Sequence, residues 1–146
     1  MKYAPIYKVM LVREGTIQHD VQVDSADKIA DLSRPIFEGM DREQMVVLLF
    51  NAKYRFIGAN VVSIGSLTAS LVHPREVMKA IVLSNAAAFA LVHNHPSGDP
   101  TPSPDDRDIT DRIRALSELM GVKMLDHMIL GDGKNFSFFQ MGLLSL

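Results

Sequence analysis

The sequence predicts one domain of the α/β or α+β class, in which about three helices pack on a mixed sheet. Residues 45–50 (MVVLLF) and 86–92 form continuous apolar runs, which are typical of central strands covered on both faces. Helix start and stop signals around these runs predict amphipathic helices. The chain has 146 residues, of which 47% are hydrophobic, so we expect one buried core.

The first half of the chain supplies five of the expected elements. Residues 6–12 and 16–23 are predicted strands around a turn at Glu14 and Gly15. A helix begins after a cap at Asp24 or Ser25 and ends near Gly39, with Pro35 able to kink its last turn. The run 45–50 is expected to pair with a strand at 55–63 across a turn at 51–54.

The second half begins with a helix that opens at His73, followed by Pro74 in its first turn. Its apolar stripe is expected to consist of Val77, Ile81 and Val82, widened by Ala80 and Leu83. A buried strand follows at 86–95, and four prolines within 96–104 exclude regular structure there. A helix over about 104–120 stops at Gly121, and strands are predicted at 122–130 and 136–139.

Composition excludes several classes of function. The formal net charge of -2 gives no general attraction to nucleic acid or to an anionic membrane. No segment is long enough to span a membrane and none reads as a signal peptide, so we expect a cytoplasmic location. The chain has no cysteine, which excludes disulfides, thiolate metal sites and cysteine nucleophiles. Any metal ligands must therefore be His, Asp or Glu.

Two histidines at the end of a predicted strand indicate a metal site. His93 and His95 are two residues apart, and the period of two along a strand places both side chains on one face. Neutral imidazole is a good ligand for zinc. Two histidines at a strand end can also be simple polar residues, so this pair alone is ambiguous.

The next helix start offers a third ligand. Ser103, Pro104 and Asp106 stand at the positions of an N-cap, a first-turn proline and an N3 acid. Asp106 is therefore explained in part by helix capping alone. A catalytic zinc site uses three protein ligands and one open position, which two histidines and one carboxylate would satisfy. Asp105, Asp108 and Asp99 are nearby alternatives.

A hydrolytic zinc site also needs a base that accepts a proton from water. Glu43 directly precedes the buried run 45–50, so its carboxylate is expected at the rim of the sheet. Glu38 and Glu76 are alternatives. His127 lies inside a predicted apolar strand, where a buried histidine bonded to a neighbour is the favoured interpretation.

The spacing of these residues matches a known signature. The run from His93 through His95 and Ser103 to Asp106 resembles the H-x-H-x7-S-x2-D motif of the JAMM (MPN+) zinc metalloprotease superfamily. The surrounding segment HPREVMKAIVLSNAAAFALVHNHPSGDPTPSPDD, the stretch at 125–129 and the dipeptide at 137–138 resemble the bacterial RadC family within it. The resemblance covers roughly residues 35–146.

The resemblance implies a fold, a cofactor and a set of roles. The fold would be the JAMM, or cytidine-deaminase-like, α-β-α sandwich, formed as a single domain over 1–146 with 1–34 packed on it. His93, His95 and Asp106 would bind one Zn²⁺. Ser103 would hydrogen-bond the attacking water or the oxyanion, and Glu43 would be the catalytic base. Longer RadC proteins carry an N-terminal region resembling helix-hairpin-helix DNA-binding modules, which we do not find in this sequence.

We therefore expect a zinc-dependent hydrolase that cleaves an amide or isopeptide bond of a peptide or protein. One alternative is a DNA-repair or recombination accessory protein that acts by binding, although the charge pattern does not support nucleic acid as a partner. Another is a JAMM domain that has lost activity and acts as a scaffold.

Overall fold

The computed structural model describes residues 1–17, 21–64 and 72–144. Within these ranges the chain forms helices and strands in the order α1 (Ala26–Phe37), β1 (Gln44–Phe50), β2 (Phe56–Ile64), α2 (Pro74–Leu83), β3 (Ala88–Asn94), α3 (Pro104–Met120), β4 (Lys123–Leu130) and β5 (Asn135–Ser137). Each element agrees in type with a segment predicted from the sequence.

The strands form one mixed sheet in the order β2-β1-β3-β4-β5. β1 is antiparallel to both β2 and β3, and β4 is antiparallel to β5. β3 and β4 run parallel and are connected through α3. The predicted hairpin of β1 and β2 is confirmed, and β1 and β3 lie at the centre of the sheet as their apolar runs indicated.

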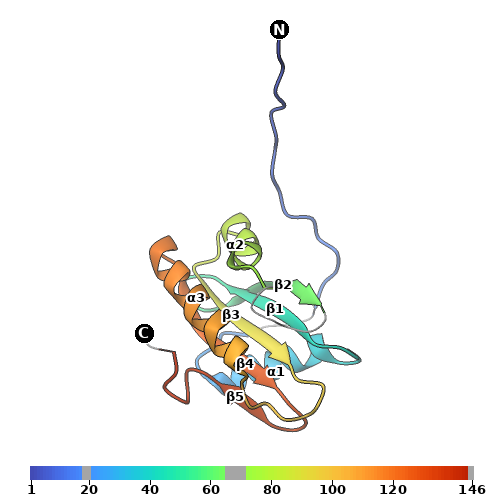
Figure 1. Ribbon diagram of the computed structural model, residues 1–146, viewed down its shortest axis with the longest axis vertical. Helices are drawn as coiled ribbons and strands as arrows, with labels where there is room; N and C mark the ends of the chain where they lie inside the picture. The colour runs from blue at the N-terminus through green and yellow to red at the C-terminus, as the bar shows by residue number, and fades with distance from the viewer. Residues whose placement is uncertain (18–20, 65–71, 145–146) are drawn as a thin grey trace.

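The sheet is covered on both faces, which gives the expected α-β-α sandwich (Figure 1). Alternate side chains of β1 belong to different hydrophobic clusters. Met45, Val47 and Leu49 pack in the cluster that contains the buried residues of α2 and α3. Val46, Leu48 and Phe50 pack in the cluster that contains those of α1. His93 has the parity of Leu91, whose side chain faces α2 and α3.

Local capping explains where the helices begin and end. In α1 the Ser25 side chain accepts a hydrogen bond from the backbone N–H of Lys28, which selects Ser25 over Asp24 as the cap. α3 ends at Gly121, whose φ of 72° is the left-handed conformation that glycine adopts without strain.

Two expectations need correction, and a third falls partly outside the described residues. Residues 6–12 form no strand: they are exposed and extend away from the domain, so 1–34 is not packed on it throughout (Figure 1). The predicted strand 16–23 overlaps residues outside the described ranges, and its described end contributes an isolated bridge from Gln22 to Arg55. Val82 is 51% exposed, whereas Met78 is buried beside Val77 and Ile81.

Among the described residues, no helix is both long enough and apolar enough to cross a membrane.

Candidate metal centre

The ends of β3 and α3 bring three of the predicted ligands together. His93 is fully buried near the end of β3, and His95 lies one residue beyond the strand with its side chain 15% exposed. Their Nε2 atoms are 3.1 Å apart. Asp106, in the first turn of α3, places Oδ1 3.2 Å from Nε2 of His93 and Oδ2 3.3 Å from Nε2 of His95.

The start of α3 holds the Asp106 carboxylate in this position. The Ser103 hydroxyl accepts a hydrogen bond from the Asp106 N–H, and Asp106 Oδ2 accepts one from the Ser103 N–H at 2.8 Å. This reciprocal capping box confirms the N-cap prediction. Capping and metal binding were alternative explanations of Asp106 from the sequence. In the structure one carboxylate caps the helix and also faces both histidines.

The spacing of these atoms fits a tetrahedral ion. With ligand distances of about 2.0–2.1 Å, neighbouring atoms of a tetrahedral zinc site lie roughly 3.3–3.4 Å apart. The separations between the His93, His95 and Asp106 atoms are 3.1, 3.2 and 3.3 Å. His93, His95 and Asp106 are therefore the residues that would hold such an ion.

The hydrogen bond behind His95 leaves its site-facing nitrogen able to bind a metal. Nδ1 of His95 lies 2.8 Å from the backbone oxygen of Asp99. A carbonyl oxygen only accepts hydrogen bonds, so Nδ1 must carry the proton. In the neutral ring Nε2 is then an unprotonated lone pair directed at His93 and Asp106, which is the protonation state that zinc requires.

The electrostatics of the site favour a cation. Burial opposes ionisation of Asp106, but the adjacent imidazoles of His93 and His95 outweigh it and hold the pKa of Asp106 well below its usual range. The Asp106 carboxylate raises the pKa of His95 against the opposing effect of burial. A buried carboxylate with two imidazole nitrogens attracts a positive charge such as that of a metal ion.

Glu43 lies at the accessible side of the same cluster. Its Oε1 is 3.7 Å from Nε2 of His95, and its side chain is 23% exposed. Potential ligand atoms of Glu43, His93 and His95 all lie within 4.8 Å of one another. The carboxylate of Asp106 is closer to both histidines than Glu43 is to His95, so distance favours Asp106 over Glu43 as the third ligand.

Asn94, the residue between the two histidines, positions the backbone around Glu43. Its Oδ1 accepts a hydrogen bond from the N–H of Gln44 at 2.8 Å, and its Nδ2 donates to the carbonyl of Arg42 at 3.1 Å. The residues on either side of Glu43 are therefore tied to the end of β3.

The alternative residues lie elsewhere or are otherwise occupied. The Asp99 carboxylate accepts hydrogen bonds from Thr101, and Asp105 and Asp108 are exposed on α3. Glu76 pairs with Lys79 on α2. Glu38 lies at the end of α1, at the edge of the neighbouring cavity.

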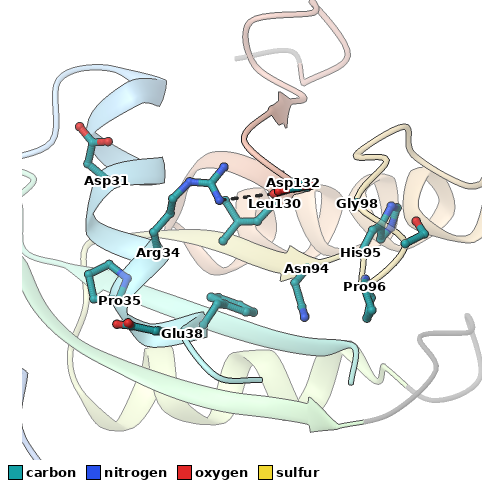
Figure 2. A pocket seen from close by; sticks show the side chains of 13 residues that line it. Asp31, Arg34, Pro35, Glu38, Asn94, His95, Pro96, Gly98, Leu130 and Asp132 are labelled. Atoms are coloured by element: carbon teal, nitrogen blue, oxygen red, sulfur yellow. Dashed lines mark hydrogen bonds between the residues drawn. The ribbon is translucent and has the colours of Figure 1, made fainter. Parts of the chain in front are cut away.

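A cavity of about 740 Å³ opens beside His95. Figure 2 shows α1 on one side of it and the end of β3 with the following loop on the other. Arg34 crosses from α1 and donates hydrogen bonds to the carbonyls of Gly131 and Lys134 and to Oδ1 of Asn135. The cavity has a size common for small-molecule sites, and of the three proposed ligands His95 lines it whereas His93 and Asp106 do not.

His127 is buried, as expected from the sequence, but its neighbour is His93. Nε2 of His127 lies 2.8 Å from Nδ1 of His93, and its Nδ1 contacts the hydroxyl of Thr110. Burial lowers the pKa of His127 well below its ordinary value. Sequence reasoning did not identify Thr110 or the Asp99 carbonyl. Thr110 carries one local signal, since it stands four residues after Asp106 on the same face of α3.

Comparisons with known proteins identify the family of the chain. A family model described as a RadC-like JAB domain matches residues 23–143. A UPF0758 protein of Caldanaerobacter subterraneus subsp. tengcongensis is 39% identical over 135 residues, covering 92% of this chain and 57% of that protein. A UPF0758 protein of Syntrophotalea carbinolica is 52% identical over 103 residues, covering 70% of this chain and 45% of that protein. The chain thus spans about half the length of these curated relatives.

Proposed function

Because the chain belongs to the RadC-like JAB domain family, we propose that it is a zinc-dependent hydrolase that cleaves an amide bond in a peptide or protein. One observation carries the proposal. Two imidazole nitrogens and one carboxylate converge within 3.3 Å of one another at the end of a central strand, beside a further carboxylate and an open cavity.

In this proposal His93, His95 and Asp106 hold one Zn²⁺. Bound zinc would supply Lewis acidity, which polarises a carbonyl group and makes water more acidic. The buried position of His93 and the capping box at Asp106 support a rigid ligand set. Rigid ligands favour catalysis because little reorganisation is needed during the reaction.

Glu43 and Ser103 act on the substrate. Glu43 is partly exposed and lies 3.7 Å from His95, so its carboxylate can accept a proton from the attacking water and deliver it to the leaving amine. Ser103 accepts from the helix start through one lone pair, which leaves its hydroxyl proton free to donate to the developing oxyanion. The cap would therefore direct the donor.

Metal analysis and a chelator-controlled peptidase screen test the proposal together. Purified protein should hold close to one zinc, and its peptidase activity should disappear with chelator and return with added zinc. Protein that holds zinc at this site without hydrolysing any peptide of the screen would support the inactive scaffold instead. DNA binding, the other alternative, would require a salt-dependent shift of DNA by the purified protein.

A further inference from the structure

A series of hydrogen bonds behind the metal centre links the backbone carbonyl of Asp106 to the imidazole of His93. Thr110 donates its hydroxyl proton to the backbone carbonyl of Asp106 at 2.7 Å and also contacts Nδ1 of His127. Nε2 of His127 in turn lies 2.8 Å from Nδ1 of His93. The three side chains are at most 1% exposed, so water does not compete for these groups.

Following the protons along this series of hydrogen bonds determines which nitrogen of His127 and of His93 is protonated. A threonine hydroxyl has a single proton, and in Thr110 it points at the Asp106 carbonyl. The Thr110 oxygen must therefore accept from His127, which places the His127 proton on Nδ1. Nε2 of His127 is then a lone pair, and it accepts from a proton on Nδ1 of His93. Nε2 of His93 is left as a lone pair facing His95 and Asp106.

We propose that Thr110 and His127 are positioning residues that hold His93 in the one tautomer able to bind a metal ion. The inference rests on the proposed metal site but concerns residues that would not touch the metal. Thr110 would act on the ion through two successive hydrogen bonds, first to His127 and then to His93. His127 stacks on Phe138 with ring centroids 4.7 Å apart, which holds the His127 imidazole in this orientation.

The opposite arrangement would work against metal binding. If His127 carried its proton on Nε2, it would donate to Nδ1 of His93, and the His93 proton would move to Nε2. That proton would occupy the direction in which the metal must bind. Outer hydrogen-bond partners of metal-binding histidines commonly change metal affinity by about 10–100-fold when they are removed.

Two variants of Thr110 isolate this effect. Thr110→Val removes the acceptor for His127 at nearly constant shape, whereas Thr110→Ser keeps the hydroxyl. We expect Thr110→Val to lower zinc affinity by about 10-fold or more in competition with a chromophoric chelator, and Thr110→Ser to stay within about threefold of the unmodified protein. His127→Gln, whose amide can accept from His93 and donate to Thr110, should bind zinc more tightly than His127→Phe, which can do neither.

The deciding measurement is the tautomer, read from long-range ¹H–¹⁵N correlations of the imidazole rings in metal-free protein at about pH 8, above the ordinary imidazole pKa of about 6.5. We expect the protons on Nδ1 of both His127 and His93, and a shift of the His127 proton to Nε2 in Thr110→Val. A His127 proton on Nε2 in the unmodified protein would overturn the inference, as would a folded Thr110→Val variant with unchanged tautomers and zinc affinity. The spectra need neither zinc nor activity. A protein that binds no zinc would therefore refute the proposed function, while the spectra would still decide whether Thr110 and His127 set the tautomer of His93.

Discussion

The candidate metal centre has a buried back wall and an accessible rim, and the two are held by different means. The back wall consists of His93, Asp106, Thr110 and His127, which are 0–2% exposed and come from β3, α3 and β4. The rim consists of Glu43 and His95, which are 23% and 15% exposed. Side chains of the back wall hydrogen-bond one another. In the rim, His95 is oriented by the backbone carbonyl of Asp99, and the backbone next to Glu43 is held by the side chain of Asn94.

The two groups of residues should therefore respond differently to substitution. Back-wall residues are part of the core as well as of the ligand set, so changing them should alter folding and metal binding together. Rim residues contribute little to the core, so changing them should alter metal binding or chemistry while the metal-free protein keeps its stability.

The largest effects should come from the two histidine ligands, which lie on opposite sides of this division. His93→Ala and His95→Ala should each lose most of the zinc. In metal-free protein, His93→Ala should also cost about 1–3 kcal/mol because it leaves a buried polar group of His127 without its partner. His95→Ala, at the rim, should cost no more than about 1 kcal/mol. Metal analysis and urea unfolding with chelator measure both. Full zinc occupancy in the double variant would exclude this site.

Glu43→Gln should separate chemistry from binding. If Glu43 is the base, the variant keeps its zinc and loses about 10²–10⁴-fold in kcat, the usual contribution of a positioned acid or base. Glu38→Gln is the matched control, since Glu38 caps the end of α1 and lines the cavity beside His95 but is not part of the cluster. Loss of zinc in Glu43→Gln would make Glu43 a ligand, and unchanged turnover would remove it from the mechanism.

Ser103 joins the two regions, because its cap fixes the Asp106 carboxylate of the back wall while the proposed mechanism uses its hydroxyl as a donor to the oxyanion. Ser103→Ala should lower stability by about 0.5–2 kcal/mol and the rate by about 10²–10³-fold. Ser103→Asn should recover the cap but misplace the donor, so it should be stable and slow. Normal turnover in Ser103→Ala, measured beside thermal unfolding, would leave Ser103 with the capping role alone.

Local signals explain which parts of the site could be predicted from the sequence. The bounds of α3 were expected at about 104–120 and observed at Pro104–Met120, because Ser103, Pro104 and Gly121 act on the adjacent turns. The approach of His93 and His95 follows from strand period and chain proximity. These features need no knowledge of distant contacts.

The parts that sequence reasoning missed depend on pairing between distant segments. His127 meets His93 because β3 and β4 are parallel in a register that pairs His93 with Ile129, which no local pattern specifies. Residues 6–12 have the composition of a strand, yet a strand also needs a partner for its backbone groups. Propensity therefore predicted residues 6–12 wrongly and the core strands correctly.

Substitution of Gly131 should disturb the loop of residues 98–100, which orients His95. A Cβ added there would lie 2.4 Å from the oxygen of Gly98 and 2.8 Å from Cδ of Pro100, so the loop must shift. Asp99, between those two residues, supplies the carbonyl that orients His95. Gly131→Ala should weaken zinc binding by about 10-fold, at the low end of the range for such partners. Gly58→Ala, whose Cβ meets only Leu49 at 3.9 Å, is the control and should bind normally.

The smallest effect should come from deleting residues 1–17, which belong to neither region. Their large apolar side chains are 42–105% exposed, and the segment extends away from the sheet (Figure 1). Since a group that is exposed in the folded chain contributes little to its stability, the deletion should change the free energy of unfolding by less than about 0.5 kcal/mol and leave zinc affinity unchanged. Urea unfolding and chelator competition on the shortened chain measure both quantities. A loss of several kcal/mol would mean that 6–12 pairs with a sheet in solution, as its composition predicted. A loss of zinc without a loss of stability would instead mean that this segment contributes to the rim, contrary to its position in the structure.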